Sequence, residues 1–76
     1  MIKATDWARD LQSNVVVTAF TADEDADISK LPLNDPVTGV NEKYGKIEIG
    51  CTATCITSSG LEVYKYREST NDWLKI

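Results

Sequence analysis

The pattern of apolar positions predicts its strongest strand at Val15-Val-Val-Thr-Ala-Phe20, a stretch without a charge. Its β-branched and aromatic residues favour extended backbone, and such a segment tends to aggregate when it is left unpaired. We therefore expect a strand over residues 14–20 that lies centrally in a sheet or at a subunit interface. Lys46-Ile-Glu-Ile49 alternates polar and apolar residues, which predicts a half-buried strand with Ile47 and Ile49 facing inward.

Residues 46–76 are expected to form a C-terminal β-meander. Glycine permits a positive φ in a tight turn, and Ser, Asn and Asp side chains bond their own backbone in turns, so both signals punctuate this region. The expected elements after the first strand are a strand over Cys51–Thr57, a turn at Ser58–Gly60, a strand over Leu61–Glu68, a turn at Ser69–Asp72 and a strand over Trp73–Ile76.

Both faces of this meander carry bulky side chains. Leu61 and Val63 alternate with Tyr64 and Tyr66 along one strand, so neither face is purely polar. A sheet with one face in water alternates more cleanly between apolar and polar residues. The pattern favours packing against a second layer, for which another copy of the chain is our first choice.

The N-terminal segment, residues 1–13, has the spacing of a short helix. Thr5 or Asp6 would cap it, and Trp7 and Leu11 stand at i and i+4 on one stripe. So short a helix is unstable alone in water and must dock. It would pack on its own sheet, or serve as an arm that docks on a neighbouring subunit or a larger particle.

Residues 21–41 are expected to form an extended loop. Pro32 and Pro36 impose extended or turn geometry on the residues before them, and loops of this length are uncommon unless they have a role or are disordered. The acidic run Asp23–Asp27 fits a solvated loop tip. Alternatively, the loop projects as a contact element or wraps a neighbouring subunit with four apolar anchors: Ile28, Leu31, Leu33 and Val37.

The chain length of 76 residues indicates one domain of marginal stability. Cys51 and Cys55 fall in one predicted strand, about 13 Å apart at roughly 3.3 Å per residue. A disulfide needs Cα atoms within about 7 Å, so these two cysteines cannot bridge each other. They are either two buried structural thiols beside Ala53 or partners in a pairing between subunits.

No metal, cofactor or catalytic constellation is predicted. The chain has no histidine, which removes the common zinc, Ser/His/Asp and Cys/His arrangements. Asp23, Asp25 and Asp27 imitate the start of a calcium loop, but Ile28 stands where glycine is needed and Asn34 where a bidentate Glu is needed. We expect a protein that is not an enzyme.

The net charge of −4 comes from the N-terminal half, since residues 41–76 hold five acids and five bases. Nucleic-acid binding requires clustered Lys and Arg for the phosphates and is not expected. The longest purely apolar run is Val15–Val17 and no secretion signal is visible, so membrane association is not expected either.

Several C-terminal residues carry a resemblance to a known class of protein. They are Gly50-Cys51-Thr52-Ala53, Ser59-Gly60, Tyr64 with Tyr66, and Trp73 with Ile76. This pattern resembles the closing segment of small virion proteins of tailed bacteriophages, such as head fibres, capsid decorations and tail-adhesin pieces, and it covers about a third of the chain. The resemblance implies a homo-oligomer, with a trimer favoured, that contacts other virion proteins in a particle assembled in a bacterial cytoplasm.

Together these patterns predict a mainly β protein: a small antiparallel sheet or meander with a short N-terminal helix and a long acidic, proline-containing loop, packed against other copies. The residues expected at the oligomer interface or in the core are Val15, Val17, Phe20, Cys51, Ala53, Cys55, Tyr64, Tyr66 and Trp73, with Trp7 and Leu11 for N-terminal docking.

The leading functional hypothesis is a phage virion structural protein. The main alternative is a small acidic inhibitor that blocks a basic surface of a host protein through Asp23–Asp27. A third hypothesis is a carbohydrate-binding module that stacks sugars on Tyr64, Tyr66 and Trp73.

Overall fold

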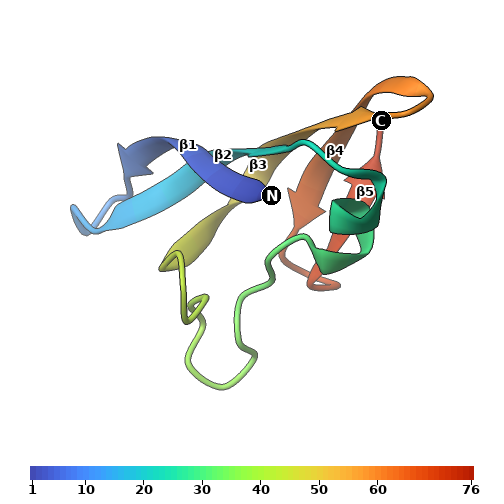
Figure 1. Ribbon diagram of the computed structural model, residues 1–76. Helices are drawn as coiled ribbons and strands as arrows, with labels where there is room; N and C mark the ends of the chain where they lie inside the picture. Colours follow the sequence, from blue (N-terminus) through green and yellow to red (C-terminus); the bar gives the residue numbers. More distant parts are fainter.

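Five strands lie side by side in the order of the sequence and form one twisted sheet (Figure 1). The computed structural model describes residues 1–76. Its elements are β1 Ile2–Arg9, β2 Val15–Ala22, the 3₁₀ helix η1 Asp25–Lys30, β3 Lys46–Thr57, β4 Gly60–Arg67 and β5 Asp72–Lys75. The prediction of a mainly β protein is confirmed.

The sheet is mixed rather than purely antiparallel. Neighbouring strands pair antiparallel except β2 and β3, which run parallel, with Phe20 opposite Ala53 and Ala22 opposite Cys55. Parallel neighbours cannot be joined by a tight hairpin and need a long crossover. The segment 23–45 supplies that crossover and includes most of the loop expected over residues 21–41.

The prediction of an N-terminal helix was wrong. Residues Ile2–Arg9 form β1 and pair along their length with β2. A helix as short as the one expected there is marginal in water. The uncharged β2, in contrast, needs a partner on each edge and finds one in the preceding segment. The i, i+4 spacing of Trp7 and Leu11 therefore has no helical meaning: Trp7 lies in β1 and Leu11 in the turn that follows.

A compact turn closes the β1–β2 hairpin. The Asp10 carboxylate accepts hydrogen bonds from the backbone N–H groups of Gln12 and Asn14, each at 2.9 Å. Ser13 adopts a left-handed φ of 65°, a conformation that costs a non-glycine residue some strain. Figure 1 shows the resulting hairpin (blue to cyan) extending to the left of the view.

The predicted C-terminal meander is present as β3, β4 and β5. The turn at Ser58–Gly60 ends in a glycine with φ 125°, and the second turn places Asn71 at φ 51°. The expected strands 46–49 and 51–57 are a single strand, β3, interrupted by Gly50 at φ 77°.

The crossover covers one face of the sheet. Leu31, directly after η1, is buried, and Asn34 pairs through its side-chain amide with the backbone of Ile47, donating at 3.0 Å and accepting at 2.9 Å. The Trp73 indole donates to the Pro32 carbonyl at 2.8 Å. These contacts fix the crossover against β3 and β5, so this face is the covered face of the sheet.

The core lies between the covered face and the crossover. Phe20 is at its centre, in edge-to-face contact with Tyr44 and Trp73 at centroid distances of 5.0 and 6.0 Å. The buried cluster consists of Val17, Phe20, Ala22, Leu31, Ile47, Cys51, Ala53, Cys55 and Tyr66. One continuous apolar layer on one side of the sheet therefore holds the fold together.

Register shifts occur at about the same level in three adjacent strands. β1 and β2 shift around Asp6, and β2 moves only from Val17 to Ala19 while its partner advances from Ile47 to Thr52. Bulges of this kind bend a sheet and turn side chains to the other face. They explain why Ile49, expected to face inward, is exposed.

Candidate functional site

The second face of the sheet has no covering layer. The register puts Thr54 opposite both Thr21 and Val63, and Lys65 opposite both Thr52 and Leu74. Since directly paired residues share a face, these positions lie opposite the core. We call this surface, where it spans β2 to β5, the open face: Ala19, Thr21, Thr52, Thr54, Ile56, Leu61, Val63, Lys65, Arg67, Asp72 and Leu74.

Large apolar side chains of the open face are in contact with solvent. Leu61 is 67% exposed, Ile56 58% and Leu74 45%, and Val63 between them is half-buried. Ile76 is 72% exposed and lies next to them, because its backbone N–H donates to the Val63 carbonyl at 2.8 Å. A contiguous apolar patch of this kind marks an interaction surface more often than a scattering of single residues does.

The charged groups of the open face are held by local partners. The Lys65 ammonium donates to the Thr52 hydroxyl at 2.7 Å, and Arg67 forms a two-point contact with Asp72 at 2.9 and 2.7 Å. Hydrogen bonds from Arg67, with help from Thr70, lower the pKa of Asp72, and the same contact raises the pKa of Arg67. The open face thus combines exposed apolar area with charges whose positions are fixed.

Most residues expected at the interface or in the core lie in the core of the same chain. Val17, Phe20, Cys51, Ala53, Cys55 and Tyr66 are at most 2% exposed, and Tyr64 and Trp73 pack against them. Val15 differs, since it is 53% exposed at the start of β2. These residues build the covered face and do not form a surface that another molecule reaches.

The two cysteines are free and buried. Burial raises the pKa of Cys51 to about 12, and the pKa of Cys55 is also raised, chiefly by burial. The reactive thiolate is therefore suppressed at neutral pH. The structure favours two core thiols over the alternative of pairing between subunits.

The expected docking residues lie on the projecting hairpin. Trp7 is 53% exposed opposite Val17, and Leu11 in the turn is 99% exposed. Neither belongs to the buried core cluster. The N-terminal element is therefore a β-hairpin whose apolar side chains are free to contact another molecule.

The acidic run is bound to the protein itself. Asp25 accepts from the backbone N–H and hydroxyl of Ser58 at 2.8 and 2.6 Å, bonds that lower its pKa. Asp23 and Asp27 both accept from the Met1 ammonium, Asp27 at 2.7 Å. The pKa of Asp23 is lowered by this contact, and the ammonium pKa is raised to about 10, first by Asp23 and then by Asp27. The run is thus neither a projecting tip nor a convergent calcium loop.

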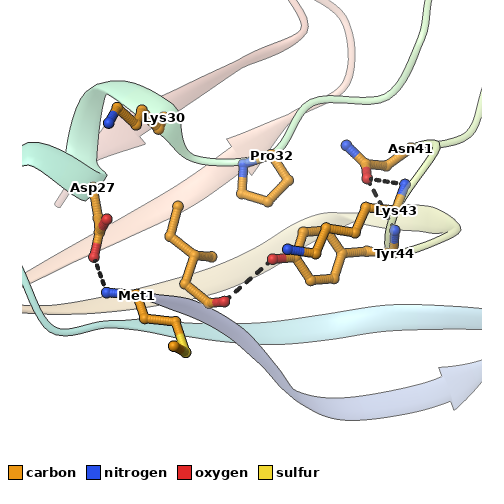
Figure 2. Close-up of a pocket in the computed structure, with 8 residues that line it drawn as sticks. Met1, Asp27, Lys30, Pro32, Asn41, Lys43 and Tyr44 are labelled. Atoms are coloured by element: carbon orange, nitrogen blue, oxygen red, sulfur yellow. Dashed lines mark hydrogen bonds and ion pairs between the residues drawn. The ribbon is translucent and has the colours of Figure 1, made fainter.

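A pocket of about 360 Å³ lies between β1, η1 and the end of the crossover (Figure 2). The Tyr44 hydroxyl donates to the Ile2 carbonyl at 3.2 Å, and the Asn41 side chain accepts from the backbone N–H groups of Lys43 and Tyr44. Figure 2 shows Lys30 and Lys43 at opposite sides of this pocket. Its polar groups mainly hold the crossover in place, and no group of three or more His, Cys, Asp or Glu residues converges here or elsewhere.

The aromatic residues considered for sugar stacking are turned inward. Tyr66 is buried, with its hydroxyl donating to the Asn71 side chain, and its ring packs on Trp73 at 5.4 Å. Stacking on a sugar requires an exposed ring face, so this trio serves the core.

The sequence indicated that Leu61 and Val63 lie on a face with bulky side chains. It did not indicate that the threonines Thr21, Thr52 and Thr54, or the apolar residues Ile56 of β3 and Leu74 of β5, belong to the same face. The signal that could have identified them is the alternation over residues 51–56. Cys51, Ala53 and Cys55 are buried in the core, and the residues between them, Thr52, Thr54 and Ile56, lie on the open face.

No family model, curated protein or solved structure matches this chain. No helix is both long and apolar enough to span a membrane.

Proposed function

We propose that this protein is a non-enzymatic structural subunit of a tailed-phage virion, a head fibre, capsid decoration or tail-adhesin piece, that assembles with copies of itself. The observation that carries the assembly is the open face, with Ile56, Leu61 and Leu74 exposed beside Val63 on a sheet that is covered on one side only. The virion assignment rests on the resemblance of the C-terminal meander to such proteins.

The size of the molecule suits assembly through a face. The molecule measures 39 × 21 × 21 Å, and a standard interface takes roughly 800 Å² from each partner. Covering that area would remove about a sixth of the 4943 Å² of accessible surface. A trimer is the assembly that the resemblance implies.

The two edges of the sheet are poorly suited to self-assembly by strand pairing. β1 is an edge strand interrupted by bulges near Asp6 and carries Lys3 and Arg9, and β5, the other edge strand, is only four residues long. Bulges, charges and short length are the features that keep edge strands from pairing with other chains. Assembly through faces and loops is therefore favoured over strand addition.

The projecting hairpin supplies a second contact, to other virion proteins. Trp7 and Leu11 are exposed there and lie outside the buried core cluster. An exposed tryptophan is a residue type enriched among the dominant contacts of protein interfaces.

The acidic-inhibitor alternative has less support. Asp23, Asp25 and Asp27 are committed to internal hydrogen bonds, and using them against a basic partner would break those bonds. The two functions also differ in salt dependence: an electrostatic inhibitor loses affinity steeply with salt, whereas apolar assembly tolerates it.

The virion assignment is tested by mass spectrometry of purified phage particles from cells that express this chain. We expect the chain in the particles at a fixed ratio to the major capsid or tail protein, retained after a wash in about 1 M NaCl. Finding the chain in the lysate but never in particles would contradict the assignment.

A further inference from the structure

The second half of the crossover, residues 35–45, forms a preorganised loop. The Asp35 backbone N–H donates to the Val40 carbonyl at 3.0 Å, and its side chain accepts from the N–H of Val37 at 2.7 Å. Gly39 donates back to the Asp35 carbonyl at 2.7 Å, and Asn41 and Gly45 exchange two backbone bonds. A loop held in this way loses little conformational entropy on binding.

This loop presents apolar side chains to solvent. Val37 is 91% exposed, Val40 40% and the preceding Leu33 42%. In contrast, Leu31 and Ile28 earlier in the crossover pack against the core. Figure 1 shows the loop (green to yellow-green) extending below the sheet, away from η1. The crossover therefore covers its own sheet with its first half and offers apolar groups outward with its second.

A second copy could bury the open face with its own open face or with its loop 35–45, and the charges of these surfaces favour the loop. On β3, β4 and β5 the open face carries Lys65 and Arg67 against Asp72, a net charge of +1. Packing two open faces together would oppose like charges. The loop 35–45 carries Asp35 and Glu42 against Lys43, a net charge of −1. Loop and open face are thus complementary in both charge and apolar character.

We propose that the loop 35–45 of one copy docks on the open face of the next, with Val37 among the side chains of Leu61, Val63 and Leu74. This inference rests on the proposed self-assembly and specifies its geometry. The contact joins two different surfaces, so it is head-to-tail, and it closes into a ring when the rotation between copies allows. Each copy then uses its loop and its open face once.

The test uses two exposed substitutions, Val37→Asp in the loop and Leu61→Asp on the open face. Neither side chain is buried in its own chain, so both variants should keep the wild-type circular dichroism spectrum. Because self-association stabilises the folded state, their melting temperatures should match that of wild type diluted until it is monomeric. Each alone should sediment near the 8.4 kDa of one chain. Mixed together they retain one intact loop and one intact open face, and should form a complex of twice that mass. Ser29→Asp, on the exposed side of η1, is the control and should assemble like wild type.

The outcomes separate this inference from the function it rests on. If Val37→Asp assembles like wild type while Leu61→Asp does not, copies meet through their open faces and the head-to-tail contact is overturned. If both single variants are monomeric but the mixture forms no complex, the head-to-tail contact is likewise overturned. If the wild-type chain is itself a monomer, self-assembly fails together with it.

Discussion

The two faces of one sheet differ although the same strands build both. On the covered face, Phe20, Ala53 and Tyr66 meet the crossover and are almost fully buried. On the open face, Leu61 of β4 and Leu74 of β5 point to the opposite side of the sheet and remain exposed to solvent. Strand alternation therefore supplied two apolar surfaces, and the crossover covers only one of them.

This difference assigns separate roles to the two faces. The covered face stabilises the monomer, because hydrophobic burial follows the apolar area removed from water. The apolar side chains of the open face contribute little to the stability of the monomer, because they stay in water. They become stabilising only when another molecule covers them. Substitutions on the covered face should change folding, and substitutions on the open face should change assembly.

The largest expected effect is a loss of folding stability on the covered face, which is tested by replacing each of the two tryptophans. Trp73→Ala removes a ring packed on Phe20 and Tyr66 and the donor to Pro32, and should cost roughly 3 kcal/mol, the low end of the range for aromatic truncation because Trp73 is partly exposed. Trp7→Ala, outside the core cluster, should cost about 1 kcal/mol or less. Urea unfolding measures both, and an equal cost would contradict the assignment of stability to the covered face.

A charge placed on the open face should break assembly and spare folding. Thr54→Glu introduces an anion between Thr21 and Val63, and should weaken self-association at least about tenfold, equivalent to roughly 1.4 kcal/mol. Ser29→Glu adds the same charge on the exposed side of η1 and should have no effect on self-association. Sedimentation velocity over a concentration series measures the strength of self-association. An equal weakening in both variants would show that the net charge, and not its position on the open face, is responsible.

The cysteines report the integrity of the covered face. Both thiols are buried, so a thiol reagent should label them only when the sheet opens, on the order of 100-fold more slowly than in the unfolded chain. Reducing agent should not change stability, because no disulfide is present. Rapid labelling of either thiol in the folded protein would contradict the core placement.

The raised thiol pKa also predicts a loss of stability in alkali. The folded pKa of Cys51, about 12, lies above the ordinary value of 9.0, so the folded state holds a proton that the unfolded chain releases. This contribution is fully present below pH 9 and is lost as the pH rises toward 12. Cys51→Ala should flatten the alkaline limb of a melting-temperature profile, and an unchanged limb would argue against the shift.

The acidic run should give the smallest effect. Asp25→Asn weakens the contact with Ser58 and should lower the melting temperature slightly, whereas Glu24→Gln next to it changes a side chain without a partner and should not. Because the Asp25 pKa is lowered in the folded protein, its contribution is present above pH 3.8 and is lost as the pH falls through the lowered value. Equal effects of the two variants at neutral pH would show that the Ser58 contact is not formed.

The sequence predicted those parts of the fold whose signals are local. The meander follows from alternation and from turn residues such as Gly60, which need no knowledge of distant contacts. β1 was missed because Trp7 and Leu11 imitate a helical stripe, and because strand formation there depends on pairing with β2. The parallel pairing of β2 with β3 joins residues 30 to 33 positions apart, and no local pattern encodes it.

The candidate site was predicted in part for the same reason. Alternation showed that Leu61 and Tyr64 belong to opposite faces, both bulky. Which of these faces is covered depends on where the crossover lies, and that is fixed by Asn34 on β3 and Trp73 on Pro32. Those are long-range contacts of single side chains, so the sequence alone could not distinguish the core face from the open face.

The most direct test of the account is the mass of the wild-type chain by sedimentation equilibrium at micromolar concentration, with and without about 1 M NaCl. A sheet whose second face is buried by another copy should give an integral multiple of 8.4 kDa, three copies in the trimer that the resemblance favours. Because apolar area drives the contact, high salt should leave that mass unchanged. A mass of 8.4 kDa across the whole concentration range would contradict the claim that the open face is an assembly surface.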